Sequence, residues 1–389
     1  MKSTLLKRLI SLILALMMMI PAALAEDVVI MVEADGEVTE IEGLSEEEDS
    51  DALAEAAAEL TEEEEALMAD IMSNLSADEE GEIDEDEAAN QANLECNQDL
   101  PNHVVNILLL GIDNRSVELE TGRSDAMIIC SINRETGSVK LTSIARDTAV
   151  QIPGYKNTNR INVAFKFGSK TGDLEKGAEL AMKTVNRNFG TNISRYVLVN
   201  IHGLADIIDA LGGVDIELTK AEAKTINYEL FVKEPMDKVK RDKLEVKDGV
   251  QHLDGMLAVT YGRIRNLNGQ NDINRNSRQR KLLETLLSKV MDGMNIATFL
   301  ALVDTALPYG RTNLTMEEIL SLGAAVLSGE AMQSLTSGGA VLEQFAIPME
   351  KQYGYRTFDG TTLIYISKKR LKTTMDAWQE FVYGETFGD

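Results

Sequence analysis

The sequence predicts an α/β domain in which helices cover the faces of a layered β-sheet. Residues 104–113 form a nearly continuous apolar run, which is typical of a strand buried on both faces. Two further predicted strands, 124–133 and 138–147, follow it directly. Later in the chain, segments with helical periodicity alternate with strand-like runs, and this alternation indicates the α/β class.

The order of the expected strands and helices can be read along the chain, and some of their ends are marked by glycine. The predicted strands are 104–113, 124–133, 138–147, 194–203, 214–219, 255–265, 344–349 and 362–367. The predicted helices are 174–189, 204–213, 271–291, 297–307, 315–327 and 371–384. Gly190 and the pair Gly212 and Gly213 stand where two of these helices should end. The charged segment 220–247 is predicted to be irregular.

The first 25 residues have the pattern of a secretory signal peptide. A basic start precedes an apolar run from Leu9 to Ile20, and the sequence Ala-Leu-Ala ends at Ala25. This run is shorter than the roughly 20 residues that span a bilayer, which favours cleavage after Ala25. An uncleaved membrane anchor is the alternative. Either way, we expect an exported protein that is extracellular or associated with the cell wall.

The net charge of −26 is concentrated in one segment of the chain. Residues 26–100 contain 29 Asp and Glu and no Lys or Arg, whereas residues 101–389 contain 35 acidic and 35 basic residues. Repulsion between like charges predicts a largely disordered or partly helical spacer over 26–100. A cation-binding or wall-spacing arm is the alternative. The ordered domain is predicted to be 101–389, beginning near His103.

Two cysteines, Cys96 and Cys130, leave their pairing open. In an oxidising compartment they could form a disulfide. Cys130 lies within an apolar run, where it is equally well explained as a small buried hydrophobic side chain.

Five arginines and no lysine fall within residues 261–280, although the chain as a whole is acidic. Arginine differs from lysine in its planar fork, which binds phosphate or carboxylate oxygens in pairs. If 255–265 is a strand, Arg263 and Arg265 lie on one face of it. The segment therefore predicts a site for a phosphate-type anion, with surface salt bridges as the alternative.

The predicted helix after this strand carries three more polar residues on its apolar side. Leu282 and Leu286 belong to a buried stripe at helical spacing, and the same line runs back toward the helix start. It includes Arg275, Arg278 and Gln279, and Asp272 is a plausible N-cap. A helix N-terminus favours anions, so these cations should have a negatively charged partner.

Other acidic and basic residues stand at the ends of the early strands. Asp113 follows the first strand, Asp125 begins the second, and Arg146 and Asp147 end the third. Arg160 follows the next loop. Because open α/β sheets bind ligands outside their strand ends, these side chains predict one shared site. Carboxylates beside arginines suit Mg²⁺ that bridges a polyphosphate.

Taken in order, these motifs resemble the LytR-CpsA-Psr family of cell-envelope proteins over roughly residues 102–385. The resemblance rests on Asp113, the triplet 123–125, the sequence SIARD at 143–147, Arg160 with Asn162, DALGGVDIEL at 209–218, YGRIR at 261–265, Asp272 with Arg275, and Arg278 with Gln279. It implies a three-layer α-β-α fold with a central mixed sheet. The core motifs would span 106–292, and C-terminal helices and strands 293–389.

The resemblance also implies an activity. Family members are phosphotransferases that move a glycopolymer from a polyprenyl-pyrophosphate carrier to peptidoglycan, with Mg²⁺, at the outer face of the cytoplasmic membrane. The polymer could be a teichoic acid, a capsule or another secondary wall polymer. The alternatives are a protein that binds the lipid-linked glycan without chemistry, a pyrophosphatase, and a transcriptional attenuator. The export signal and the neutral domain argue against binding to nucleic acid.

Roles for individual residues follow from the match. The family's metal-binding aspartates correspond to Asp113 and Asp125. Pyrophosphate and head-group contacts are expected from Arg123, Arg160, Arg263, Arg265, Arg275, Arg278 and Gln279. Arg146 is expected to be catalytic, and Asp147 and Asp272 are candidates for the general base. One departure from the family pattern SIPRD is Ala145, which stands in the position of the proline.

Overall fold

The computed structural model of the protein describes thirteen stretches of the chain. They are residues 30–32, 38–40, 93–112, 120–156, 158–233, 242–264, 278, 281–282, 285–286, 289, 310–330, 343–358 and 361–387. The predicted signal peptide, most of the predicted acidic spacer and the predicted helix 297–307 lie outside them. No helix within these stretches has the length and apolar character needed to cross a membrane. In the N-terminal part, β1 (Ile30–Val32) pairs with β2 (Val38–Glu40) in antiparallel fashion.

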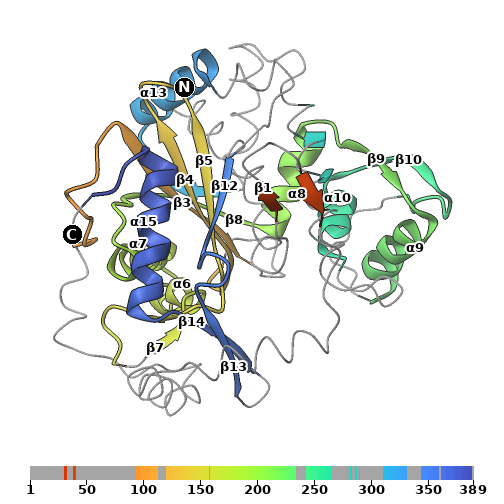
Figure 1. The fold of residues 1–389 in the computed structure, drawn as a ribbon. Helices are drawn as coiled ribbons and strands as arrows, with labels where there is room; N and C mark the ends of the chain where they lie inside the picture. Colours follow the sequence, from red (N-terminus) through yellow and green to blue (C-terminus); the bar gives the residue numbers. More distant parts are fainter. Residues whose placement is uncertain are drawn as a thin grey trace.

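A six-stranded mixed sheet forms the centre of the molecule (Figure 1). Its strands, in spatial order, are β11 (Gly310–Thr312), β8 (Arg195–Asn200), β3 (Val104–Ile112), β4 (Ser124–Asn133), β5 (Val139–Ile144) and β12 (Glu343–Ile347). β8 is parallel to β3, and β12 is parallel to β5. The other neighbours are antiparallel. This arrangement confirms the predicted central mixed sheet.

Helices cover both faces of the sheet, as the two separate cores show. On β3, Ile107 and Leu109 belong to one core, while Leu108 and Leu110 belong to the other. The first core includes residues of α8 (Ile201–Ala210), α10 (Gly255–Arg263) and α13 (Met316–Ser328). The second includes residues of α6 (Val163–Gly168), α7 (Leu174–Phe189) and α15 (Lys368–Tyr383). The expected three-layer α-β-α architecture is therefore confirmed.

The helix α7 begins and ends as its sequence predicts. The carboxylate of Asp173 accepts hydrogen bonds from the first-turn amides of Glu175 and Lys176, and Gly190 follows the helix with a positive φ of 62°. The side chain of Asn186, in its last turn, donates to the carbonyl of Leu94 at 2.8 Å. The ordered domain therefore begins earlier than His103, because residues 93–100 of the predicted spacer lie against α7.

A small lobe projects from the main body (Figure 1). It consists of a two-stranded antiparallel sheet with a helix and a π-helical turn, namely β9 (Val214–Leu218), α9 (Lys220–Tyr228), η2 (Glu229–Lys233) and β10 (Gly249–Leu253). The prediction that 220–247 is irregular was wrong over α9 and η2. Thr219 and Glu222 form a capping box that starts α9 despite the charged composition of the segment.

The segment 255–265 was predicted to be a strand and is instead largely the helix α10. Asp254 caps this helix by accepting from the amide of Leu257 at 2.9 Å. Gly255 lies so close to α8 that a β-carbon there would be 1.8 Å from the carbonyl oxygen of Ala205. Because every residue of α10 except Arg263 is buried, its apolar residues follow no clear helical period, which explains the error.

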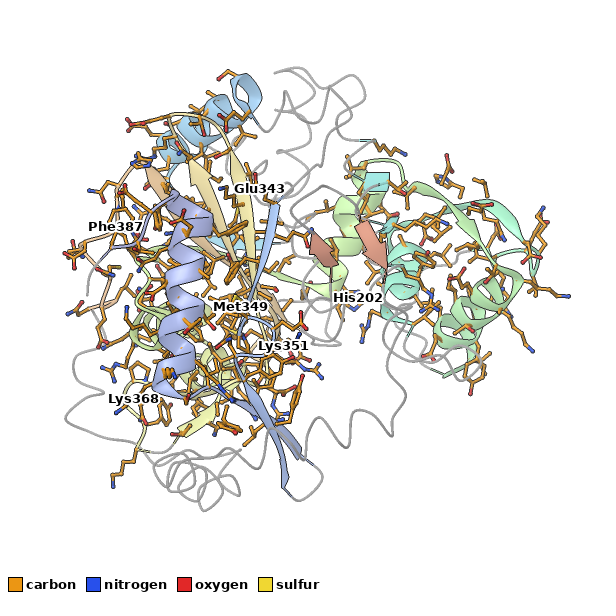
Figure 2. The ribbon with its side chains drawn as sticks, in the orientation of Figure 1. His202, Glu343, Met349, Lys351, Lys368 and Phe387 are labelled. Carbon is orange, nitrogen blue, oxygen red and sulfur yellow. The ribbon has the colours of Figure 1, made fainter. Side chains whose placement is uncertain are left out.

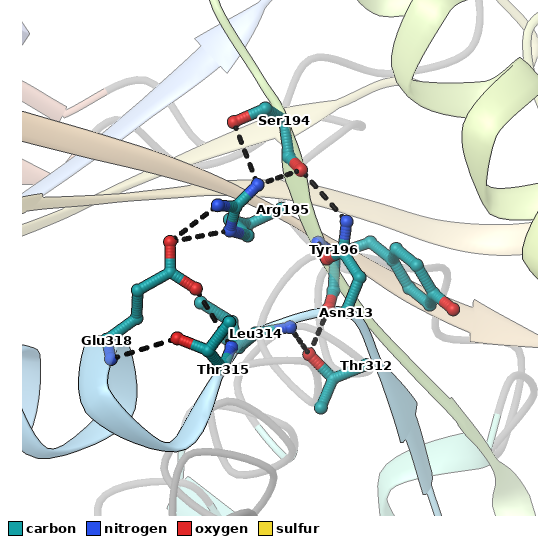
Figure 3. A network of polar contacts seen from close by, with 8 residues as sticks. All are labelled: Ser194, Arg195, Tyr196, Thr312, Asn313, Leu314, Thr315 and Glu318. Atoms are coloured by element: carbon teal, nitrogen blue, oxygen red, sulfur yellow. Dashed lines mark hydrogen bonds and ion pairs between the residues drawn. The ribbon is translucent and has the colours of Figure 1, made fainter. Parts of the chain in front are cut away.

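A polar network ties α13 to the beginning of β8 (Figure 3). The guanidinium of Arg195 donates twice to Oε1 of Glu318, at 2.8 and 2.6 Å. The other carboxylate oxygen of Glu318 accepts from the amide of Thr315, which completes a capping box. Partial burial acts to raise the pKa of Glu318, but these hydrogen bonds and the nearby positive charge outweigh it and hold the pKa at about 2.

Two short antiparallel hairpins complete the described fold. They are β6 (Ala149–Gln151) with β7 (Thr158–Arg160), and β13 (Gly354–Phe358) with β14 (Thr361–Tyr365). Both cysteines are free, so the structure contains no Cys96–Cys130 disulfide. Cys130 is fully buried in the core, and burial raises the pKa of its thiol to about 12.

Candidate functional site

One edge of the central sheet gathers the carboxyl ends of four strands. β3 and β8 end side by side, with Ile112 opposite Asn200, and β4 begins at the same level with Ser124 opposite Ile112. β5 and β12 also end at this edge, since both run parallel to one another and antiparallel to β4. Figure 2 labels Met349 and His202, which follow the ends of β12 and β8. Residues at this edge converge although they are far apart in sequence.

Four of the predicted site residues form a continuous chain of contacts there. Nη1 of Arg146 lies 3.7 Å from Oδ2 of Asp125, and its Nε donates to Oδ2 of Asp147 at 3.2 Å. The other oxygen of Asp147 lies 3.7 Å from Nη1 of Arg160. The structure thus brings two carboxylates and two guanidinium groups into one cluster.

Asn162, the N-cap residue of α6, supports this cluster from below. Its side-chain amide donates to Oδ1 of Asp125 at 3.1 Å. Its backbone N–H donates to the carbonyl of Arg146 at 3.2 Å, and its own carbonyl accepts from the amide of Ser124 at 3.0 Å. One buried asparagine therefore links the start of β4 to the loop after β5, which fixes the distance between Asp125 and Arg146.

The side chains of the cluster differ in their exposure to solvent. The side chains of Arg146 and Asp125 are 36% and 30% exposed, whereas that of Arg160 is 12% exposed. The backbone carbonyl of Asp147 accepts from the amide of Ile364 at 3.0 Å, so β14 supports the loop that carries Arg146. Arg146 is thus anchored by its neighbours yet open to a ligand. A cation with two carboxylates beside it suits an anionic ligand that also carries a metal ion.

The oxygen atoms at this edge fit the predicted Mg²⁺. Mg²⁺ prefers oxygen ligands and usually takes one or two carboxylates together with phosphate oxygens and water. Asp125 supplies a partly exposed carboxylate, and Oδ1 of the buried Asn162 has no hydrogen-bond partner in the described structure. Within the described stretches no three His, Cys, Asp or Glu residues are placed to hold a metal. The other expected ligand, Asp113, lies outside them.

The remaining predicted residues are distributed differently. Arg123 is half-buried directly before β4, and Arg263 is exposed as the last residue of α10. Four others lie outside the described residues, namely Arg265, Asp272, Arg275 and Gln279. Their predicted roles stay predictions.

Arg278 has a different environment from the one predicted for a pyrophosphate ligand. Its side chain is buried, as expected from the stripe that continues through Leu282 and Leu286. Its Nε donates to Oε1 of Glu222 at 2.8 Å, and its Nη1 donates to the carbonyl of Ile264 at 3.1 Å. In the described structure, Arg278 therefore has a negatively charged partner in Glu222 of the small lobe.

Two residues with important contacts were not among the predicted site residues. Asn162 is part of one of the motifs that resemble the family, but its position in the sequence did not predict its contact with Asp125. Glu222 stands three residues after Thr219, and this spacing is the sequence signature of a capping box. That signature could have predicted the start of α9, whereas the pairing with Arg278 depends on the tertiary fold.

The sequence of the chain matches a known family over most of its length. The model of the LytR_cpsA_psr family matches residues 69–377. The chain belongs to the LytR_cpsA_psr family. The match begins within the acidic segment and ends within α15, so the whole central sheet and the site at its edge lie inside the family region.

Several proteins with names that state a function are similar in sequence to part of this chain. TagU of Bacillus cereus, a polyisoprenyl-teichoic acid–peptidoglycan teichoic acid transferase, is 31% identical over 218 residues, which are 56% of this chain and 63% of the relative. The TagU protein of Oceanobacillus iheyensis is 34% identical over 218 residues, 56% of this chain and 61% of the relative. The match thus spans less than two thirds of either relative.

A solved structure supports the fold assignment. The crystal structure of a protein from Streptococcus agalactiae aligns with 74% of this chain and 90% of its own, with a TM-score of 0.54 and 22% sequence identity. At this level of identity the comparison concerns the fold alone, and it agrees with the three-layer architecture described above.

Proposed function

We propose that the protein is a phosphotransferase that moves a wall glycopolymer from a polyprenyl-pyrophosphate carrier to peptidoglycan. The observation that carries this proposal is the cluster of Asp125, Arg146, Asp147 and Arg160 at the carboxyl edge of the sheet. TagU of Bacillus cereus, a relative in the same family, is named for the transfer of teichoic acid to peptidoglycan. The polymer would be a teichoic acid, a capsule or another secondary wall polymer.

The arginines of the site would bind the diphosphate of the carrier. Arg146 lies beside two carboxylates and is partly exposed, so phosphate oxygens could approach its guanidinium group. Arg160, Arg123 and Arg263 would add positive charge around the same ligand. Phosphoryl transfer depends mainly on positioning and charge neutralisation, and convergent guanidinium groups supply both.

The proposed reaction is a substitution at phosphorus. A hydroxyl oxygen of a peptidoglycan sugar attacks the phosphorus atom that carries the glycan, and a new P–O bond forms. The bond from this phosphorus to the bridging oxygen breaks, and polyprenyl phosphate leaves with the electron pair. The hydroxyl proton passes to a general base, for which Asp147 is the candidate within the described residues and Asp272 the candidate outside them.

The contacts of Asp147 also suggest a second task for it. Both of its carboxylate oxygens are engaged, one by Arg146 and the other by Arg160. Asp147 would therefore orient the two guanidinium groups whether or not it accepts the proton. Replacement of Asp147 by asparagine would remove the base and one of these two contacts together, because asparagine keeps only one oxygen acceptor.

We further propose that Mg²⁺ takes part. Asp125, with Asp113, would hold the ion, and Oδ1 of Asn162 is a neutral oxygen beside Asp125. The ion would supply positive charge that neutralises the diphosphate. We also propose that the protein is exported by its N-terminal signal and acts at the outer face of the cytoplasmic membrane, where lipid-linked polymer and peptidoglycan meet.

The test is a product analysis with purified protein, a radiolabelled lipid-linked teichoic acid and peptidoglycan. We expect label to appear in peptidoglycan together with free polyprenyl phosphate. Arg146→Ala should lower the rate by on the order of 100-fold or more, since a preorganised charge donor is lost. Arg134→Ala is the matched control, because Arg134 is exposed in the turn between β4 and β5, at the opposite edge of the sheet.

Other outcomes would assign another activity. Release of free glycan phosphate without labelled peptidoglycan would indicate a pyrophosphatase. Tight binding of the lipid-linked donor without any product would indicate a carrier protein. Transfer by Arg146→Ala at the rate of the Arg134→Ala control would contradict the proposed site.

A further inference from the structure

The ion pair between Arg278 and Glu222 is the most enclosed pair of charges in the described structure. Their side chains are 5% and 12% exposed, and Nε of Arg278 lies 2.8 Å from Oε1 of Glu222. Burial of two charges is costly unless each is fully engaged by hydrogen bonds. Oε2 of Glu222 accepts from the amide and the hydroxyl of Thr219, at 2.9 and 3.0 Å. Both carboxylate oxygens are thus used within the protein.

The second contact of Arg278 is with the end of α10. Its Nη1 donates to the carbonyl of Ile264, the residue that follows the last helical residue, Arg263. The carbonyl groups at a helix C-terminus have no partner within the helix and carry partial negative charge, so a cation there stabilises the helix end. Arg278 therefore joins three elements, namely α9 through Glu222, the end of α10, and its own segment.

Tyr261, one turn before this end, lies in the electric field of the same pair. Desolvation raises its pKa above the usual range, and the negative charge of Glu222 raises it further, while Arg278 acts in the opposite direction. Tyr261 is 2% exposed. The last turn of α10 is thus held from inside by a buried ring and from its end by a guanidinium group.

We infer that Glu222 and Arg278 are positioning residues that hold the C-terminal end of α10, and with it Arg263, in place for the diphosphate of the donor. This inference rests on the proposed function, in which Arg263 binds that diphosphate. It assigns Arg278 to the support of the site, because Nε and Nη1 of its guanidinium already have partners inside the protein. Arg263 itself is exposed at the end of α10.

The chain contains a matched control for this arrangement. Thr315 and Glu318 form the same kind of capping box as Thr219 and Glu222, and Glu318 is likewise paired with an arginine, Arg195. Arg195 is the first residue of β8, whereas the site lies beyond the last one, Asn200. Five residues of strand separate them by about 16 Å. The two pairs differ in burial, since the side chains of Arg195 and Glu318 are 30% and 21% exposed, and only the pair of Glu222 contacts the end of α10.

The experiment compares Glu222→Gln with Glu318→Gln in the full chain. Thermal unfolding measures stability, and calorimetric titration with geranylgeranyl diphosphate in detergent measures binding of the donor's lipid diphosphate. We expect both variants to lower Tm, and only Glu222→Gln to weaken diphosphate binding, by on the order of 10- to 100-fold. Arg263→Ala should weaken binding to a similar extent with little change in Tm.

The direction of the change distinguishes support from direct binding. If Arg278 contacted the diphosphate, Glu222→Gln would free its guanidinium from a competing carboxylate and binding would become tighter, which would overturn the inference. Equal affinities of Glu222→Gln and Glu318→Gln, with a clear loss in Arg263→Ala, would also overturn it but leave the proposed function intact. Unchanged binding in both Arg263→Ala and Arg146→Ala would instead contradict the proposed function.

A milder pair of variants covers the case in which Glu222→Gln does not fold. Thr219→Ala removes the hydroxyl that accepts from the amide of Glu222, and Thr315→Ala removes the hydroxyl that accepts from the amide of Glu318. The same pattern is expected, with a smaller loss of affinity confined to Thr219→Ala. Equal affinities of these two variants would overturn the inference.

Discussion

The backbone N–H of Ala145 donates to the carbonyl of Ile347 at 2.9 Å, which joins β5 to β12 directly before Arg146. The family pattern has proline at this position, and proline has no N–H to donate. In this chain, the hydrogen bond from Ala145 restrains the backbone beside the site, as the proline ring would in the family pattern.

Replacement of Ala145 by proline should therefore destabilise this protein. The carbonyl of Ile347 would lose its donor in a buried place, at a cost of about 1–3 kcal/mol in the free energy of unfolding. Urea denaturation measures the change. Ala145→Ser keeps the N–H and is the control. If the proline variant is as stable as the serine variant, this hydrogen bond contributes nothing to stability.

Removal of metal ions should stop transfer if Mg²⁺ binds at Asp125. We expect chelation by EDTA to abolish activity and added Mg²⁺ to restore it, because the diphosphate would lack its neutralising cation. Asn162→Ala removes the hydrogen bond to Asp125 and should raise the Mg²⁺ concentration needed for half-maximal activity by roughly 10- to 100-fold. Activity that persists in EDTA would exclude the metal.

Acid should weaken the fold partly through Glu318. Its pKa is about 2 in the folded protein and near the ordinary value of 4.5 in the unfolded chain. The unfolded chain therefore takes up the proton first, so this contribution to stability is complete above pH 4.5 and is lost as pH falls toward 2. Glu318→Gln should be less stable at pH 7 and should lose less stability between pH 5 and pH 3. Parallel pH profiles for the two proteins would contradict this.

Loss of Asn186 should loosen the segment 93–97 as well as α7. Its amide donates to the carbonyls of Leu94 and Ile193, and its oxygen accepts from Thr191 and from the amide of Ile193. Asn186→Ala would leave several buried groups without partners, which should cost on the order of 3 kcal/mol in stability.

Hydrogen exchange provides the local measurement for this variant. Amides of residues 95–97 should exchange faster in Asn186→Ala than in the wild type. Gln98→Ala is the control, since Gln98 is exposed and, within the described residues, its side chain donates to the nearby carbonyl of Cys96. Faster exchange confined to α7, with residues 95–97 unchanged, would show that other contacts hold the segment.

The central strands of the sheet could be predicted because runs of apolar residues indicate that they are buried. β3 and the middle of β4 are apolar on both faces, and both strands are too short for a long helix. α10 is also apolar on nearly all sides, and a short apolar run does not distinguish a buried helix from a buried strand. The contact between Gly255 and Ala205 that decides the matter is a tertiary one.

The candidate site was predictable to the same degree. Asp125, Arg146 and Asp147 lie at the ends of predicted strands, so their convergence at one edge follows from the layout of an open sheet, and Arg160 comes from the loop that follows. The partner of Arg278 was not predictable, because Glu222 lies 56 residues earlier, in a segment predicted to be irregular. Helical periodicity indicated that Arg278 faces inward, but periodicity does not identify the acidic residue with which it pairs.

The alternation along β3 has a consequence for the tolerance of the chain to insertions. Ile107 and Leu109 contribute to one core, and Leu108 and Leu110 to the other. A register shift of one residue between β3 and its neighbours would place each of these side chains in the opposite core. They would then pack against a different set of helices. An added or deleted residue inside β3 would therefore disrupt both halves of the molecule at once.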